Sequence, residues 1–255
     1  MTDCKGVPTP MTSPCTFADS RRVIGKLHYL SFTRPDIGFA VSKLSQFIHN
    51  PKVSHWKAIK CLLRYLKHTI TLGVQLSREP TDRLPAYADS DWAGNPQDRT
   101  STTGYVVYLG NSPVFWSSKK QKSVSRSSTE AEYRVVATVV SEVNWLTNLL
   151  RELHKSMFAS PTIFCDNVST TYSCANPVFH NRMKHVAIDF HFVREQVQHK
   201  ALEVRHLHSA DQVVDVLTKP LPRIAFQRHF HKLVLFQSPP TCEGVLRDNR
   251  CYPFV

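Results

Sequence analysis

No stretch of the 255 residues approaches the roughly 20 consecutive apolar residues that a membrane-spanning helix needs. The first residues contain no apolar core of a secretion signal. Seven cysteines occur without a C-x-x-C pair, and none of the 13 histidines forms an H-E-x-x-H pattern, so the sequence supports neither a disulfide framework nor a zinc site. We therefore expect an intracellular protein, in the cytoplasm or the nucleus, with no membrane partner.

Positive charge and a sufficient share of apolar residues are what the chain does have. Hydrophobic residues make up 42% of the sequence and charged residues 20%, a composition that can bury a core. The net charge is +12, and residues 1–80 contribute +8 of it, with 12 Lys and Arg against 4 Asp and Glu. This excess favours a polyanionic partner such as nucleic acid, and the alternative is a basic protein without one.

Helical periodicity dominates residues 1–80. Ser20 is the predicted cap of a first helix that Pro35 stops, a second helix runs from Asp36 to Asn50, and Ser54 is the predicted cap of a third. The third helix carries a basic stripe, which is either a solvated face or a surface that follows phosphates. The stripe consists of Lys57, Lys60, Arg64 and Lys67.

Residues 81–236 follow a different pattern, after a predicted linker at 77–83. The predicted strands are 84–92, 104–109, 114–118, 162–165 and 202–207, and the predicted helices are 128–153, 168–175, 185–199, 210–218 and 222–235. This order predicts an α/β fold, in which helices cover a mixed five-stranded sheet. Residues 237–255 are expected to form a loose tail.

Two acidic residues occupy positions where a charge is unfavourable without a partner. Asp89 lies inside the first predicted strand of the sheet. Glu132 continues, one step toward the N-terminus, the apolar stripe of the helix at 128–153, so its carboxylate is expected to face the sheet. Glu130 points elsewhere and forms an S-x-x-E capping box with Ser127. The alternative for Glu132 is a first-turn residue favoured by the helix dipole.

Two further aspartates lie at the ends of elements. Asp166 ends a strand and is either a site residue or the start of a turn, while Asp215 is either a site residue or a solvent-facing helix residue. Carboxylates that cluster repel one another, and a divalent cation relieves the repulsion. Oxygen ligands without nearby His or Cys select Mg²⁺ or Mn²⁺, and two such ions support phosphodiester hydrolysis. The four residues therefore suggest a metal-dependent nuclease.

The motifs of this chain resemble the C-terminal part of copia-type retrotransposon Pol polyproteins. The resemblance covers about residues 20–235. It is carried by TRPDI at 33–37, LRYLK at 63–67, YADSDWAG at 87–94, DRTSTTGY at 98–105, WSSKKQ at 116–121, SSTEAEY at 127–133, CDN at 165–167, KHVAID at 184–189 and DQVVDVLTKPL at 211–221.

The resemblance implies a ribonuclease H-like domain at 81–236 and, before it, a remnant of the thumb and connection region of a reverse transcriptase. It implies that Asp89, Glu132, Asp166 and Asp215 are the catalytic residues and the ligands of two Mg²⁺ ions, with Mn²⁺ as a substitute. Asp189 is a rival for the fourth ligand, although a structural hydrogen bond suits it better. The implied activity cuts the RNA strand of an RNA–DNA hybrid, and the missing reverse transcriptase portion is an expected partner.

Basic and hydroxyl side chains near the sheet are candidates for contact with the hybrid. The candidates are Arg99, Ser101, Thr102, Lys119, Lys120, Lys122 and Arg126. The alternative is a solvated hairpin and loop.

Two departures from the family pattern bear on activity. No Asp-Asp dipeptide occurs, so the polymerase centre is absent and DNA synthesis is not expected. Val214 stands where the family usually has Ala, and it adds a branched side chain beside the last aspartate. Three interpretations remain open: an active endonuclease from a truncated polyprotein, an inactive remnant, and a non-catalytic nucleic-acid-binding module.

Overall fold

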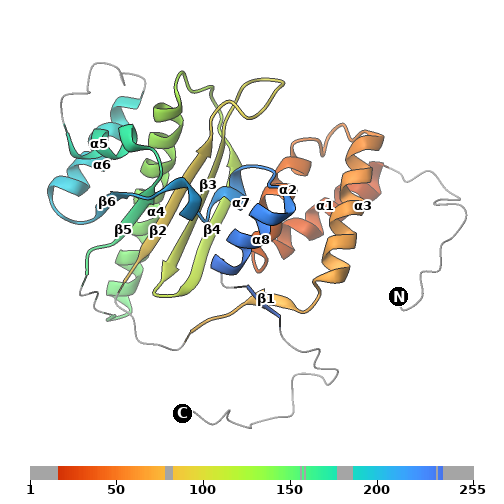
Figure 1. Cartoon of the computed structure of the whole chain (residues 1–255), viewed down its shortest axis with the longest axis horizontal. Helices are drawn as coiled ribbons and strands as arrows, with labels where there is room; N and C mark the ends of the chain where they lie inside the picture. Colours follow the sequence, from red (N-terminus) through yellow and green to blue (C-terminus); the bar gives the residue numbers. More distant parts are fainter. Residues whose placement is uncertain are drawn as a thin grey trace, which may run out of the picture.

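The computed structural model describes residues 17–77, 83–155, 157, 159–176, 186–233 and 235–237 (Figure 1). Its helices are α1 Phe17–Leu30, η1 Pro35–Ile37, α2 Gly38–Ser45, α3 Val53–His68, α4 Ser128–Glu152, α5 Val168–Ala175, α6 Ala187–Gln198, η4 Ser209–Asp211, α7 Asp215–Thr218 and α8 Arg223–Lys232. Its strands are β1 Leu72–Val74, β2 Pro85–Asp91, β3 Thr102–Leu109, β4 Ser112–Lys120, β5 Thr162–Cys165, β6 Glu203–His206 and β7 Leu235–Gln237.

The central sheet has the strand order β4-β3-β2-β5-β6. Strands β2, β3 and β4 pair antiparallel, and β5 and β6 join them in parallel. The turn from β3 to β4 needs a left-handed residue, which Gly110 supplies with φ of 61°. The order and directions of the strands confirm the predicted fold class, an α/β ribonuclease H-like mixed five-stranded sheet with flanking helices and a preceding helical segment.

Each face of the sheet has its own core. One face packs against α4, α5 and α6 around Ala88, Val136 and Ile163. The other face packs against α7 and α8 around Val106, Val214 and Leu217. Because strand side chains alternate, Ala88 faces α4 while its neighbour Asp89 faces α7. Helices α1, α2 and α3 form a third core beside the sheet.

Several contacts join the helical segment to the sheet. Trp116 on β4 donates from its indole N–H to the carbonyl of Ser31, at 2.8 Å. A Cβ atom on Gly38 of α2 would lie 3.1 Å from the Leu217 side chain, so this glycine lets α2 and α7 approach closely. The short β1 pairs antiparallel with β7, with Leu72 opposite Gln237. Residues before and after the central sheet are thus linked through the backbone.

Several helix boundaries differ from the predictions. Ser20 lies inside α1 and is buried, and α3 begins at Val53, so neither Ser20 nor Ser54 is a cap. The predicted helix 210–218 is broken into η4 and α7, because Gln212 between them is buried and its amide donates to the Ala88 carbonyl at 2.9 Å. The pairing of β1 with β7 was not predicted.

Parts of the prediction lie outside the described residues. These are the linker at 78–82, the KHVAID motif up to His185, and the tail from residue 238 onward. Among the described residues, no helix combines the length and the apolar character needed to cross a membrane.

Candidate active site

Four carboxylates from four elements meet at the ends of β2 and β5. Asp89 comes from β2, Glu132 from the first turns of α4, Asp166 from the residue after β5, and Asp215 from the start of α7. Asp89 and Asp166 link the four electrostatically. Besides burial, the charges of Asp215 and Asp166 raise the pKa of Asp89, and those of Asp89 and Asp166 raise the pKa of Glu132. All four sequence-predicted acidic residues therefore belong to one cluster, called the acidic site below.

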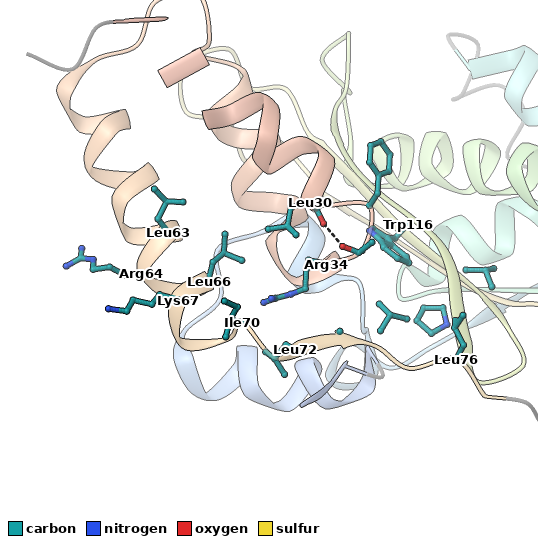
Figure 2. Close-up of a pocket in the computed structure, with 16 residues that line it drawn as sticks. Leu30, Arg34, Leu63, Arg64, Leu66, Lys67, Ile70, Leu72, Leu76 and Trp116 are labelled. Atoms are coloured by element: carbon teal, nitrogen blue, oxygen red, sulfur yellow. Dashed lines mark hydrogen bonds between the residues drawn. The ribbon is translucent and has the colours of Figure 1, made fainter. Parts of the chain in front are cut away.

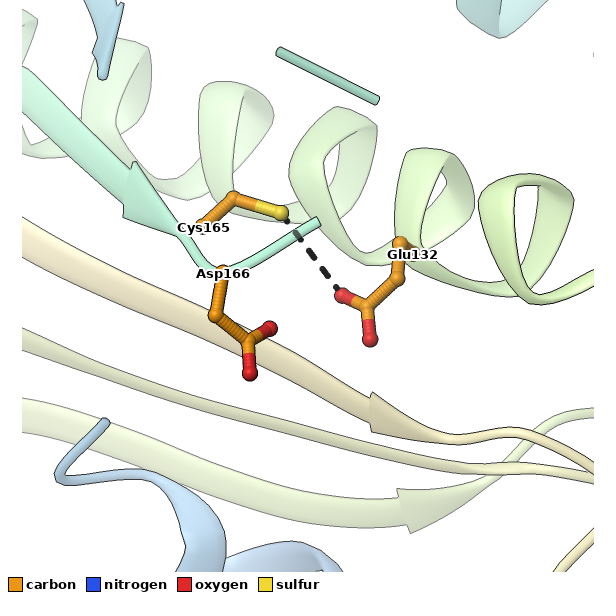
Figure 3. Close-up of side chains that lie close together, drawn as sticks. All are labelled: Glu132, Cys165 and Asp166. Atoms are coloured by element: carbon orange, nitrogen blue, oxygen red, sulfur yellow. Dashed lines mark hydrogen bonds between the residues drawn. The ribbon is translucent and has the colours of Figure 1, made fainter. Parts of the chain in front are cut away.

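Glu132 is held rigidly on the α4 side of the acidic site. Its Oε1 accepts a hydrogen bond from the Ser90 amide at 3.0 Å, and its Oε2 accepts from the Cys165 thiol at 3.8 Å. Burial, with the charges of Asp89 and Asp166, raises the pKa of Glu132 to about 9. Figure 3 shows the side chains of Glu132 and Asp166 pointing into the same space beyond the end of β5.

The local sequence explains why Glu132 points inward. The Ser127 hydroxyl accepts a hydrogen bond from the Glu130 amide at 3.1 Å, which fixes where α4 starts. Glu130 itself accepts from the amide of Arg126, at 2.9 Å, and pairs with Arg134. The capping role predicted for Ser127 is confirmed. The capping box would also have the Glu130 carboxylate accept from the Ser127 amide, but it accepts from the Arg126 amide instead.

Asp89 is held on the α7 side. Its carboxylate accepts a hydrogen bond from the Thr218 hydroxyl and lies 3.8 Å from the ammonium of Lys219. Burial raises its pKa to about 6, against the lowering effect of Lys219 and Thr218. Asp215 lies 2.8 Å from the same ammonium. Neither Thr218 nor Lys219 was predicted as a site residue. Thr218 lies three residues after Asp215 on the same helix, and Lys219 is the next residue, with an extended backbone.

The chemistry of the donor set suits hard divalent cations. Glu132, Cys165 and Asp166 each offer a ligand atom within 4.8 Å of the other two. The additional carboxylates of Asp89 and Asp215 make the site predominantly one of oxygen donors, which Mg²⁺ and Mn²⁺ prefer. Buried carboxylates with raised pKa values and mutual repulsion are the electrostatic state that a bound cation relieves.

Two other acidic residues are placed outside the acidic site. Asp189 at the start of α6 lies near Arg134 of α4, whose charge opposes the increase in its pKa on burial. Asp91 stabilises the turn after β2, because its carboxylate accepts from the Thr102 amide at 2.8 Å. Val214 is fully buried and belongs to the core on the α7 face.

The candidate nucleic-acid contacts divide by exposure. Arg99, Lys119, Lys122 and Arg126 are exposed, and Lys120 is half-buried and paired with Asp98. Ser101 and Thr102 are buried, and the Ser101 hydroxyl accepts from the Ala93 amide at 3.1 Å. The three lysines line a cleft of about 360 Å³ beside the sheet, together with Arg134 and two carboxylates, Glu142 and Asp189.

A larger cavity of about 1300 Å³ lies away from the acidic site, between α1, α3, β1 and β4. Its lining is mainly apolar and includes Leu30, Leu66 and Trp116 (Figure 2). The charged ends of Arg64 and Lys67 point away from it. Its walls carry none of the four acidic residues.

Comparisons with known proteins give extensive matches in sequence. The chain is 52% identical to the retrovirus-related Pol polyprotein from transposon RE2 of Arabidopsis thaliana, over 97% of this chain and 18% of the relative. It is 53% identical to the corresponding polyprotein from transposon RE1 of the same plant, over 91% of this chain and 16% of the relative. The polyprotein from transposon TNT 1-94 of Nicotiana tabacum is 37% identical, over 80% of this chain and 15% of the relative. The chain thus spans less than a fifth of these relatives, and no protein-family model matches it.

Solved structures match at much lower identity. The LC11 ribonuclease H1 isolated from compost has a TM-score of 0.43 and 14% identity, over 59% of this chain and 99% of that protein. The foamy viral protease-reverse transcriptase in complex with an RNA/DNA hybrid has a TM-score of 0.47 and 12% identity, over 96% of this chain and 28% of that protein.

Proposed function

Because this chain belongs to the Pol polyproteins of copia-type retrotransposons, we propose that it carries a ribonuclease H activity, which cuts the RNA strand of an RNA–DNA hybrid. One observation carries the proposal: carboxylates from four separate segments of the chain converge near the ends of two adjacent parallel strands. Repulsion among these carboxylates opposes folding. Their clustering is accounted for if they hold two divalent ions that assist phosphodiester hydrolysis.

The residues that would hold the ions are Asp89, Glu132, Asp166 and Asp215, with Mg²⁺ as the expected ion and Mn²⁺ as a substitute. When bound, such ions lower the pKa of water and stabilise negative charge on phosphodiester oxygens. The chain's own contribution is position. The Ser90 amide orients Glu132, and the Thr218 hydroxyl orients Asp89, so both carboxylates are fixed before a substrate arrives.

Recognition of the hybrid would use the basic cleft beside the sheet. Lys119 and Lys122 are exposed there, and Arg126 is exposed in the loop that leads to α4. These side chains suit contact with backbone phosphates, and Arg99 adds an exposed cation near β3. Discrimination of RNA from DNA would depend on the 2′-hydroxyl and the shape of the minor groove.

The remainder of the Pol polyprotein is the partner that we expect on the apolar cavity. The relatives continue far beyond the matched segment, and the side chains of Phe32, Ile70 and Leu76 at the cavity are largely exposed. Burial of such side chains in a neighbouring part of the same polypeptide removes apolar surface from water. Mixing the chain with the part of the RE2 polyprotein that lies outside the matched segment, with Ile70→Glu as the variant that should not bind, tests this contact.

The activity is tested with a hybrid labelled on its RNA strand. Wild-type chain, Asp89→Asn and Asp166→Asn are compared in Mg²⁺ and in EDTA, with Glu203→Gln as a control at an exposed carboxylate on β6. We expect metal-dependent cutting by the wild type and the control and none by the two site variants. Binding without cutting by the wild type would favour the non-catalytic module, and a folded chain that does neither would favour the inactive remnant.

A further inference from the structure

Lys219 places a positive charge among the carboxylates of the acidic site. Its ammonium lies 2.8 Å from Asp215 Oδ1 and 3.8 Å from Asp89 Oδ2. These two carboxylates come from α7 and β2, so a single side chain bridges the helix and the sheet. We propose that Lys219 is the resident counter-ion of the metal-free site, and that divalent cations bind in competition with it. The inference rests on the proposed function, because it assigns metal ligands to the same carboxylates.

The local sequence determines the backbone position of Lys219, but its long side chain leaves the ammonium group free to move. Lys219 directly follows α7 and has an extended backbone, and its side chain reaches back to Asp215 at the start of that helix. Pro220 comes next and cannot continue the helix. The Lys219 side chain is 38% exposed, whereas that of Asp89 is 4% exposed. The long stem therefore connects a buried carboxylate to solvent, and its ammonium has an exit that Asp89 lacks.

Electrostatic repulsion prevents the Lys219 ammonium and a divalent cation from occupying the acidic site together. The ammonium offsets part of the repulsion between Asp89 and Asp215 when no metal is present. A divalent cation held by the same carboxylates would be repelled by an ammonium within a few ångströms. Binding therefore requires the lysine to leave, and the affinity for Mg²⁺ is reduced by the strength of the contacts that it gives up.

A second lysine supplies a matched control. Lys232 on α8 pairs with Asp211 at 2.7 Å, and its side chain is 36% exposed, close to the value for Lys219. Asp211 is itself exposed and is not among the four carboxylates of the acidic site. Lys232→Met and Lys219→Met thus make the same change of charge, and only the second makes it inside the acidic site.

The experiment measures the affinity of the full chain for Mg²⁺ alone, by calorimetry, together with the melting temperature in EDTA. We expect Lys219→Met to lower the melting temperature in EDTA and to tighten Mg²⁺ binding about tenfold, because a competing charge is gone. Lys219→Arg keeps the positive charge, so its affinity for Mg²⁺ should stay within about twofold of that of the wild type. Lys232→Met should leave Mg²⁺ affinity unchanged. If Lys219→Met is poorly folded without metal, Lys219→Gln is measured in its place.

The outcomes separate the two proposals. Unchanged or weaker Mg²⁺ binding by the neutral Lys219 variants, with tight binding by the wild type, overturns the counter-ion role alone. Absence of Mg²⁺ binding in the wild type and in every variant overturns the metal site of the proposed function, and the counter-ion role with it. An equal tightening in Lys232→Met overturns the role as well, since it would trace the effect to overall charge.

Discussion

Gly104 lies directly opposite Asp89 in the ladder between β2 and β3. A Cβ atom on Gly104 would collide with the methyl group of Thr218 and would lie 2.8 Å from Val214 Cγ1. The missing side chain is therefore what lets α7 approach the sheet closely enough for the Thr218 hydroxyl to reach Asp89. A glycine in a strand interior marks such a close approach.

Gly104→Ala should consequently damage both stability and the acidic site. Overpacking at this contact is expected to lower the free energy of unfolding by about 1–3 kcal/mol and to move Thr218 away from Asp89. Chemical denaturation measures the first effect and hybrid cleavage the second. Gly25→Ala is the control, because a Cβ there meets nothing within 4 Å and α1 should gain about 0.5–1 kcal/mol. A stable, fully active Gly104→Ala would contradict the packing argument.

Glu132→Gln should stabilise the metal-free chain and abolish cleavage of the hybrid. Burial and two neighbouring carboxylates raise the pKa of Glu132 to about 9, so its ionised form is unfavourable in the folded chain. The amide keeps an acceptor for the Ser90 amide and removes the charge. We expect a higher melting temperature in EDTA and no cleavage of the hybrid. A melting temperature in EDTA below that of the wild type would show that the charge of Glu132 supports the fold.

The same residue sets the direction of a pH dependence. The folded-state pKa of Glu132 lies above the ordinary value of 4.5, so between these two values the folded chain holds more protons than the unfolded chain. Stability of the metal-free wild type should therefore fall as pH rises from about 5 to about 9. Mg²⁺ should restore more stability at the higher pH, and Glu132→Gln should flatten the metal-free profile. Melting curves across this range, with and without Mg²⁺, check both statements.

A buried charge network explains the TRPDI motif at 33–37. Arg34 donates two hydrogen bonds to Asp36, at 2.8 and 2.7 Å, and the Tyr65 hydroxyl donates to the same carboxylate at 2.7 Å. Both charged residues are almost fully buried. Arg34→Met leaves the Asp36 charge without its partner and should reduce the free energy of unfolding by about 3–5 kcal/mol. The double variant Arg34→Met/Asp36→Leu should lose less than the single one in denaturant titrations, and a larger loss would contradict this account.

Periodicity predicted the parts of the site that depend on local sequence. The apolar stripe of α4 correctly predicted that Glu132 is buried, although Leu153, at the end of the predicted helix 128–153, lies just after α4 and is exposed. The strand at 162–165 was predicted with its observed ends, which places Asp166 where the sheet opens. The prediction that the four acidic residues lie together was based on these local positions and on the family motifs.

Contacts between distant segments could not be predicted in this way. The amide of Gln212 reaches the carbonyl of Ala88, 124 positions earlier, and this bond interrupts what the sequence presents as one helix. The pairing of β1 with β7 likewise joins segments that are far apart in the chain. Neither contact leaves a periodic signal, because each depends on how the sheet is already assembled.

The basic cleft beside the sheet and the basic stripe of α3 are two rival surfaces for the hybrid. Lys119→Ala/Lys122→Ala removes two exposed charges from the cleft, and Lys57→Ala/Arg64→Ala removes two exposed charges from α3. Each phosphate contact makes the plot of log affinity against log salt steeper by about 0.9. We therefore expect the cleft variant to reduce the magnitude of this slope by about 2. The α3 variant should leave the slope unchanged if its stripe is a solvated face. Fluorescence anisotropy with a labelled hybrid in Ca²⁺, over a salt series, measures both slopes, and a larger change from α3 would move the interface to that helix.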